Sequence, residues 1–246
     1  MLRHRPEHLR ATSKSTPTDA VTEMDAASER LIVDRLLAAR PGDRIVGEEG
    51  ARHEGTDDDV VTWYVDPIDG TVNYLYALPQ FSVSIAAYVA GAAVAGVVYD
   101  VMRDEMYAAA LGGGATCNGV ALRCTPQTDL SLSLVATGFA YSAQTRAAQA
   151  QVLLHVLPTV RDIRRLGSAA LDLCAVAAGR VDGYYEAGMH PWDWAAGALI
   201  ASEAGARVGG LGGRPPGDWT TLAANPVLFE ELERLLISAG VEPPAS

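Results

Sequence analysis

One short stretch, Asp66-Pro67-Ile68-Asp69-Gly70-Thr71, constrains this chain of 246 residues more than any other. It follows the apolar run at 60–65, which predicts a buried strand. Pro67 fixes its own φ and favours an extended conformation at Asp66, so the chain must turn there. Both carboxylates, joined by the Ile68 carbonyl, can then face one point beyond the strand end. Such oxygen ligands select hard cations, Mg²⁺ above all.

A helix is expected to begin after Gly70, and its free N–H groups would favour a phosphate beside the same cation. The stretch also has a simpler interpretation. Asp66 would then cap the turn and Asp69 would cap the helix, as Asp does in many proteins without any metal. The hexapeptide alone leaves both interpretations open.

Two further acidic motifs favour the metal site. Gly47-Glu48-Glu49-Gly50 lies upstream, and Pro191-Trp192-Asp193-Trp194-Ala195-Ala196-Gly197 lies far downstream. Each has an alternative: Glu48 and Glu49 could be a solvated loop pair, and Asp193 could be the N-cap of the helix that follows. Three such motifs in one chain are nevertheless far more specific than a single short pattern.

Together with the run from Lys14 to Asp25, these motifs resemble the inositol monophosphatase family, relatives of fructose-1,6-bisphosphatase. Family members carry a GEE turn, a DP(I/L)DGT loop and a WDxAAG helix start. The chain is similar above all to the bacterial inositol-1-monophosphatases, from Lys14 to its last helix. The resemblance implies a mixed α+β and α/β fold, a five-layer αβαβα sandwich.

The resemblance also implies a magnesium-dependent phosphatase that is sensitive to lithium. The implied ligands of two Mg²⁺ ions are Glu48, Asp66, the Ile68 carbonyl, Asp69 and Asp193, with Asp66 shared between the ions. Two such ions can clamp the attacking and leaving oxygens of an in-line displacement.

Water is the expected nucleophile, since family members use no covalent one. Asp25 and Thr71 are the candidates for orienting and deprotonating it. Asp25 has an alternative role, because Thr22-x-x-Asp25 is also the capping box of a predicted helix.

Substrate contacts follow from the same resemblance. The backbone N–H groups of Gly70 and Thr71 would hold the phosphate, and the loop at Ser168 and Ala169 would offer backbone groups to the inositol ring. Glu186 stands at the family position that accepts a hydrogen bond from an inositol hydroxyl, although it could also only cap a strand end. The neighbouring pair Arg164-Arg165 could meet an anionic substrate or lie on the surface.

Three functional interpretations remain. The leading one is hydrolysis of myo-inositol monophosphate, and the second is the same chemistry on histidinol phosphate or fructose 1,6-bisphosphate. Nucleotide substrates are disfavoured because no basic pocket is evident in the sequence. The third is a regulatory binding partner that retains the fold.

Charge and cysteine content narrow the class of protein. The formal net charge of −11 argues against a nucleic-acid partner. The three cysteines lack metal-site spacing and do not suggest a disulfide framework, and residues 1–13 lack the apolar segment of a signal peptide, so a cytoplasmic location is expected.

The segment 70–99 contains no charged residue, and part of it is long enough to span a bilayer. Its β-branched and small residues, with Ala90-Gly91-Ala92 at a turn position, instead predict two buried strands of a hairpin. No membrane association is expected.

The remaining pattern divides the chain into residues 1–128, a half with helix and antiparallel sheet, and residues 129–246, a layered α/β half, packed as one compact unit. A helix over 22–39 is expected to bury Met24, Ala27, Leu31 and Leu36. Further strands are predicted at 45–46, 60–66, 82–89, 93–99, 105–110, 131–137, 161–166, 182–186 and 220–223, and helices at 143–157, 168–179, 194–204 and 226–239.

Relatives carry a long helix before the position of Lys14, where this chain has thirteen residues. That helix normally covers the sheet. We therefore expect either a late start at Met1 or a partner subunit over the sheet face, and family members are commonly homodimers.

Overall fold

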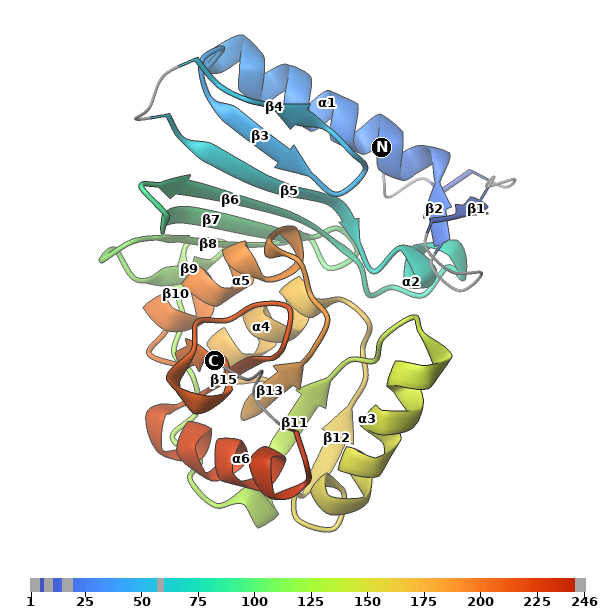
Figure 1. Ribbon diagram of the computed structural model, residues 1–246. Helices are drawn as coiled ribbons and strands as arrows, with labels where there is room; N and C mark the ends of the chain where they lie inside the picture. Colours follow the sequence, from blue (N-terminus) through green and yellow to red (C-terminus); the bar gives the residue numbers. More distant parts are fainter. Residues whose placement is uncertain (1–4, 7–10, 15–19, 57–59, 242–246) are drawn as a thin grey trace.

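Two β-sheets alternate with three layers of helices (Figure 1). The computed structural model describes residues 5–6, 11–14, 20–56 and 60–241. The run from Lys14 to Asp25 is therefore described only in part, and 15–19 lie outside the described residues. The helices are α1 (Glu23–Ala39), α2 (Thr71–Leu75), α3 (Ala143–Val156), α4 (Ala169–Ala177), α5 (Pro191–Glu203) and α6 (Pro226–Ser238).

The first sheet has eight strands in the described part of the chain, in the order β10-β9-β8-β7-β6-β5-β3-β4. All neighbouring strands are antiparallel except β3 and β5, which are parallel. The strands are β3 (Arg44–Gly47), β4 (Arg52–His53), β5 (Thr62–Asp69), β6 (Ser82–Val89), β7 (Ala92–Asp100), β8 (Glu105–Ala110), β9 (Ala115–Cys117) and β10 (Val120–Ala121). A small separate pair is formed by β1 (Ala11–Ser13) and β2 (Ala20–Thr22).

The second sheet has the order β12-β11-β13-β15-β14 among the described residues. Strand β11 is parallel to both of its neighbours, whereas β15 is antiparallel to β13 and β14. The strands are β11 (Leu134–Thr137), β12 (Asp162–Arg164), β13 (Gly183–Glu186), β14 (Arg207–Gly209) and β15 (Thr221–Ala224). Short 3₁₀ turns stand at Leu130–Leu132 and Leu211–Gly213.

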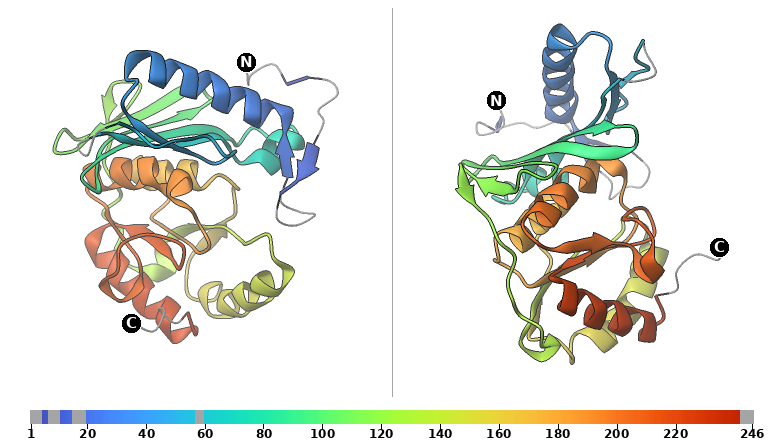
Figure 2. Two further views of the ribbon diagram at one scale, coloured as in Figure 1. Left: turned by 45° about the horizontal axis from the view of Figure 1, so that its top comes forward. Right: turned by 90° about the vertical axis from the view of Figure 1, so that its left-hand side faces the viewer.

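The layers follow the predicted αβαβα order, which is confirmed. Helix α1 covers the outer face of the first sheet, α4 and α5 lie between the sheets, and α3 and α6 cover the outer face of the second (Figures 1 and 2). The hairpin predicted in the uncharged segment is also confirmed, as β6 and β7. No helix in the described ranges is long and apolar enough to cross a membrane.

Several element boundaries differ from the sequence prediction. Strand β5 runs on through Asp69 instead of ending at Asp66, and α5 begins at Pro191 instead of residue 194. Strands β4, β9, β10 and β14 were not predicted; each has only two or three residues, too few to show an alternating pattern.

Helix α1 packs a polar side against the first sheet. The prediction that its apolar residues would be buried there is therefore wrong. Leu31 is 47% exposed, and the buried residues are Asp25, Ser28 and Glu29. The Ser28 hydroxyl donates to the Pro67 carbonyl at 3.3 Å. Buried polar groups need partners, and those of α1 lie largely in the segments that form the cavity described below.

The central layer depends on small residues. A Cβ on Gly96 of β7 would lie 3.0 Å from the Cα of Ala196 on α5. A Cβ on Gly197 would lie 2.8 Å from the Cβ of Leu173 and 3.2 Å from the Ala170 carbonyl oxygen, both on α4. Glycine at 197 therefore sets how closely α4 and α5 approach.

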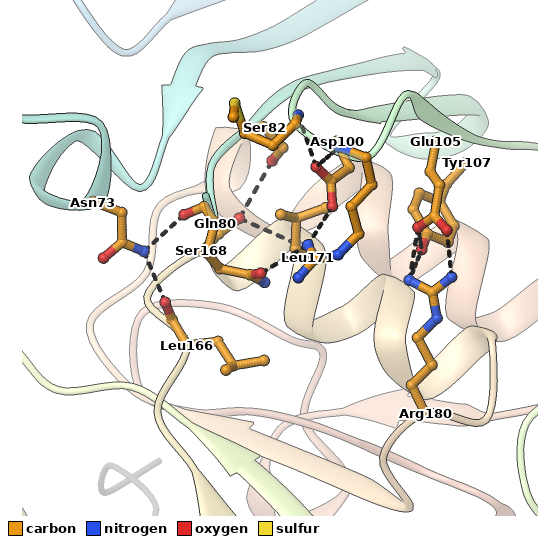
Figure 3. Close-up of polar contacts among 12 residues, drawn as sticks. Asn73, Gln80, Ser82, Asp100, Glu105, Tyr107, Leu166, Ser168, Leu171 and Arg180 are labelled. Carbon is orange, nitrogen blue, oxygen red and sulfur yellow. Dashed lines mark hydrogen bonds and ion pairs between the residues drawn. The ribbon is translucent and has the colours of Figure 1, made fainter. Parts of the chain in front are cut away.

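Polar contacts join the chain before residue 128 to the chain after it (Figure 3). The Asn73 side-chain amide donates to the Leu166 carbonyl at 2.7 Å, and the hydroxyls of Ser82 and Ser168 lie 3.3 Å apart. Arg180 is 2.6 Å from Glu105. The first two contacts hold the loop before α4 against α2 and the start of β6, and the third joins the chain after α4 to β8. A division at residue 128 itself stays a prediction.

We predict that Gly197→Ala lowers the free energy of unfolding by about 1–3 kcal/mol through overpacking. Helix propensity alone would favour alanine by about 1 kcal/mol, so a loss means that the contact with α4 dominates. Urea unfolding measures the change. Gly217→Ala is the matched control, because its Cβ would meet no atom within 4 Å. A Gly197→Ala protein at least as stable as the control would contradict this packing account.

Candidate active site

A cavity of about 510 Å³ lies where the loops of both sheets meet. Among the residues predicted to form the site, those that line it are Glu48, Asp66, Ile68, Asp69, Gly70, Thr71, Ala169, Glu186 and Asp193. The two remaining predicted residues lie just behind the wall. Asp25 contacts Thr71, and Ser168 contacts Asp69. The structure thus brings all eleven together.

The irregular end of β5 positions two of the carboxylates, Asp66 and Asp69. Pairing of β5 with β6 shifts register between Asp66 and Asp69, so the strand bends there. Asp66 Oδ1 accepts a hydrogen bond from the Ile68 N–H at 2.9 Å, which means that the turn-capping role holds. Gly70 has a φ of 95°, and a Cβ there would lie 3.0 Å from the carbonyl oxygens of Gln80 and Gly167. Only glycine fits this position without strain.

Asp69 does not cap the helix that follows it, so that alternative is wrong. Helix α2 begins after Gly70 without a side-chain cap. Asp69 Oδ2 instead accepts from the Ser168 hydroxyl at 2.6 Å and from the Ala170 N–H at 2.8 Å. The carboxylate therefore lies at the positive end of α4, where a negative charge is stabilised.

Asp25 fills its predicted capping role and also contacts Thr71, its predicted catalytic partner. Its Oδ2 accepts from the Thr22 N–H at 2.8 Å, and the capping box at the start of α1 is complete. Its Oδ1 lies 3.0 Å from the Thr71 hydroxyl, which is also 3.0 Å from the Ile68 carbonyl oxygen. A hydroxyl has one proton to donate, so these two acceptors share it.

Glu48 and Glu49 are not a solvated pair. Lys14 Nζ lies 2.8 Å from Glu48 and 2.6 Å from Glu49. Glu29 of α1 orders the turn, because its carboxylate accepts from the N–H groups of Glu49 at 2.9 Å and Ala51 at 3.0 Å. The other carboxylate oxygen of Glu48, Oε2, is buried without a hydrogen-bond partner among the described residues.

Asp193 stands in the first turn of α5, whose N-cap is His190. Its Oδ2 accepts from the His190 N–H at 2.7 Å. The predicted role as N-cap is therefore wrong, because Asp193 is the third residue of the helix. Its carboxylate still accepts a hydrogen bond from a backbone N–H group at the helix start.

Burial and mutual repulsion weaken the ionised form of these carboxyls. The pKa of Asp66 lies well above its usual value, first because the group is buried and then because Glu48, Asp69 and Asp193 repel its charge. The pKa of Asp193 is raised in the same way, by burial and then by repulsion from Glu48 and Asp69. Burial raises the pKa of Asp69 to about 6, although the Ser168 and Ala170 donors lower it. A cation in the cavity would reverse this balance.

These residues fit divalent cations by ligand chemistry. All are oxygen donors, as Mg²⁺ prefers, and Glu48 Oε2 is an unpaired buried oxygen on the cavity. Within the described ranges, no group of three or more His, Cys, Asp or Glu side chains is already arranged to hold an ion. Because Lys14 and backbone N–H groups hold the carboxylates at present, an ion would have to displace part of these contacts.

The opposite wall of the cavity carries Glu186 at the end of β13. Its Oε2 accepts from the Tyr184 hydroxyl at 2.8 Å. A Cβ on Gly138 would lie 2.0 Å from its carboxylate, so glycine is needed there. Arg165 also lines the cavity, whereas Arg164 pairs with Asp162 at 2.6 Å and lies outside it.

Sequence reasoning missed several residues of the site. Lys14 was noted only within a family motif, and Glu29 carried no motif at all. The run Phe139-Ala140-Tyr141-Ser142 also lines the cavity. The signal that could have been used is the helical spacing of Asp25, Ser28 and Glu29, which places three polar residues on one side of α1.

The five-layer fold and the carboxylate-lined cavity are those of a phosphatase, and comparisons with known proteins agree. The chain belongs to the inositol monophosphatase family, whose model matches residues 2–240. The inositol-1-monophosphatase SuhB of Mycobacterium tuberculosis is 56% identical over 203 residues, 80% of this chain and 70% of the relative. The Nus factor SuhB of Escherichia coli is 44% identical over 204 residues, 82% of this chain and 76% of the relative.

Solved structures give the same result. The extragenic suppressor protein SuhB of Bartonella henselae has a TM-score of 0.88 at 36% identity, and the match covers 94% of this chain and 89% of that one. An IMPase of Thermotoga maritima has a TM-score of 0.84 at 32% identity, covering 94% and 88%. Both the predicted family and the predicted fold are confirmed.

We predict that the metal-free protein loses stability as pH rises from about 5 to about 8. Burial raises the pKa of Asp69 from 3.8 to about 6, and that of Glu186 from 4.5 to about 7. A carboxyl with a raised folded-state pKa contributes stability below the unfolded-state pKa, and this contribution is lost as pH rises through the folded-state pKa. For Asp69 alone the loss is about 1–2 kcal/mol between pH 5 and pH 8, about half of the full effect of its pKa shift, because the other half is already lost below pH 5.

Urea unfolding with a chelator at pH 5 and pH 8 measures this change. Mg²⁺ should restore most of the loss at pH 8 and little at pH 5, because the carboxyls compete with protons. Glu105 does not contribute to the stability change between pH 5 and pH 8, because its hydrogen bond with Arg180 lowers its pKa to about 2 and it stays ionised throughout. Equal stability at both pH values in chelator would contradict the assigned electrostatics.

Proposed function

We propose that this chain is a Mg²⁺-dependent phosphomonoesterase that hydrolyses myo-inositol monophosphate to inositol and phosphate in the cytoplasm. One observation carries the proposal: Asp66 is buried among three other acidic residues on a cavity that also holds the Asp25–Thr71 hydrogen bond. Membership of the inositol monophosphatase family supports the reaction class. The name of the mycobacterial relative supports the substrate.

In this proposal Glu48, Asp66 and the Ile68 carbonyl would hold one ion. Asp66, Asp69 and Asp193 would hold a second. When bound, Mg²⁺ supplies positive charge that lowers the pKa of water and stabilises the charge of the reacting phosphate. The protein would contribute carboxylates held near one another by their own hydrogen bonds, and once an ion has displaced part of these contacts the fixed ligands would need little further reorganisation during the reaction.

Asp25 and Thr71 would prepare the attacking water. The Thr71 hydroxyl can accept a hydrogen bond from a water in the cavity while it donates its own proton to Asp25, 3.0 Å away. Burial raises the pKa of Asp25, although Thr22 and Thr71 lower it. A carboxylate of raised pKa is a better general base at neutral pH.

Substrate would bind between two walls. The N–H groups of Gly70 and Thr71 would meet the phosphate, although α2 has only five residues and its dipole is small. Ala169 and Glu186 would meet the sugar ring. Ser168 would act through its backbone, because its hydroxyl is already bound to Asp69.

We further infer lithium sensitivity and a homodimer, both from family resemblance. A second candidate function is regulatory binding, because the relative from E. coli is named a Nus factor. Regulatory binding needs the fold and not the ions, so a variant that folds without catalysis separates the two functions.

We predict that Asp66→Asn lowers kcat by several orders of magnitude, at least about 100-fold, because the variant loses the carboxylate shared by both proposed ions. Asp25→Asn should lower kcat with nearly normal Mg²⁺ affinity, since Asp25 lies behind Thr71. Turnover of inositol 1-phosphate and calorimetric Mg²⁺ titration measure both effects. Normal turnover and unchanged Mg²⁺ affinity in Asp66→Asn would refute the ligand assignment. If Asp25→Asn only lowers thermal stability, the capping role alone accounts for Asp25.

We predict that Glu186→Gln raises KM for inositol 1-phosphate about ten- to a hundredfold, the effect of losing a hydrogen bond to a charged group. A small aromatic phosphate ester, which has no ring hydroxyls, should be hydrolysed as before. Steady-state kinetics with both esters gives the comparison. Equal losses on both would assign Glu186 a structural role instead.

A further inference from the structure

Aromatic and imidazole rings line the cavity beside its carboxylates, and the proposed reaction uses none of them. Phe139 and Tyr141 come from the segment before α3, and His190 and Trp192 come from the start of α5. Single exposed rings are ordinary on protein surfaces. Rings gathered around one cavity are instead typical of ligand sites, where they pack against apolar parts of the ligand while polar groups fix its orientation.

The segment before α3 fixes the backbone at Tyr141 by hydrogen bonds from the helix itself. Arg146 Nη1 donates to the carbonyl oxygens of Ala140 at 3.0 Å and Tyr141 at 2.8 Å. Gln149 Oε1 accepts from the Ala140 N–H at 3.0 Å, and the Ser142 side chain caps the helix. The first turns of α3 therefore place Tyr141 on the cavity.

The Tyr141 side chain lies outside the hydrophobic core. It is 42% exposed. In the described stretch 141–151 no residue is buried, and α3 reaches the core only further on, at Val156. Replacing the Tyr141 ring should therefore leave the packing of the fold intact, so a change in the function of the site can be measured separately.

The aromatic segment borders the carboxylate proposed to meet a substrate hydroxyl. A Cβ on Gly138 would lie 2.0 Å from the Glu186 carboxylate, and Phe139 follows directly in the chain. Phe139 is half-buried, so Tyr141 is the more exposed of the two rings. The rings at the start of α5 pack against each other, with centroids 4.9 Å apart. Tyr141 is therefore the ring most available to a ligand near Glu186.

A cyclic leaving group needs two kinds of contact. Inositol carries its hydroxyls mainly around the edge of its ring, and C–H groups occupy both faces. A carboxylate such as Glu186 can bind the edge, whereas a face is matched by an apolar surface such as an aromatic ring. An aromatic leaving group presents a similar apolar face, and a small open-chain polyol presents none.

We propose that Tyr141 is a specificity-determining residue: its ring packs against the face of a cyclic leaving group, so the site prefers cyclic phosphate monoesters to open-chain ones. This inference rests on the proposed phosphatase activity. It does not require inositol to be the substrate, because an aromatic ester offers a ring face as well. Glu186 then recognises hydroxyls and Tyr141 recognises the ring.

Steady-state kinetics with three esters at saturating Mg²⁺ tests the proposal. Tyr141→Ala should raise KM about three- to tenfold for both inositol 1-phosphate and phenyl phosphate, with kcat within about twofold. KM for glycerol 2-phosphate, which has hydroxyls and no ring, should stay the same. Tyr141→Phe keeps the ring and should restore the KM of both ring esters. Leu154→Ala is the matched control, because Leu154 is an exposed α3 residue that does not line the cavity.

Calorimetric titration with two phosphonates, which are not hydrolysed, gives a readout without turnover. Tyr141→Ala should bind phenylphosphonate about three- to tenfold more weakly than the unaltered protein does, and methylphosphonate equally well. Unchanged binding of the ring ligand, equal losses on ring and open-chain ligands, or a Tyr141→Phe protein as impaired as Tyr141→Ala overturns the proposal. Turnover of phenyl phosphate without turnover of inositol 1-phosphate would instead refute the inositol assignment, and the phenyl ligands would still decide the role of Tyr141.

Discussion

Repulsion among buried carboxyls is the constraint on which the rest of this structure depends. Two like charges about 4 Å apart repel by about 4 kcal/mol at an effective dielectric near 20, and burial adds a further cost for each. The chain opposes this cost with a separate protein donor for each group. Asp69 has the start of α4, Asp193 the start of α5, and Asp66 the turn at Ile68. The N-terminal N–H groups of α4 and α5 therefore also stabilise carboxylates of the cavity.

The polar side of α1 follows from the same constraint. A helix over a sheet normally buries apolar residues, yet α1 buries Asp25, Ser28 and Glu29. Ser28 and Asp25 bond to the stretch from Pro67 to Thr71, and Glu29 bonds to the turn at Glu49. The small residues of α4 and α5 then bring those helix starts close to the loops of the first sheet, and Gly197 sets the closest approach. The close packing of α4 and α5 in the central layer thus determines where their N-terminal N–H groups meet the carboxylates of the cavity.

Much of the fold could be predicted from the sequence, because long periodic segments and dense turn residues mark it. The hairpin of β6 and β7 is one example, since its β-branched residues distinguish strands from a membrane helix. The carboxylates of the cavity were found because they lie in short motifs. Their partners were not: Ser168 is 99 residues from Asp69 in sequence, and no local pattern connects them. Leu31 was misplaced because periodicity cannot show which side of a helix a polar site requires.

The central claim is that the carboxylates around Asp66 form a site for divalent cations. Anomalous diffraction from crystals soaked in Mn²⁺, a substitute for Mg²⁺ with the same preference for oxygen ligands, tests it most directly. The account predicts two anomalous peaks in the cavity, one between Glu48, Asp66 and the Ile68 carbonyl and one between Asp66, Asp69 and Asp193. It also predicts that Lys14 moves away from Glu48. No peak in the cavity at saturating Mn²⁺, with Lys14 still paired to Glu48, would contradict it.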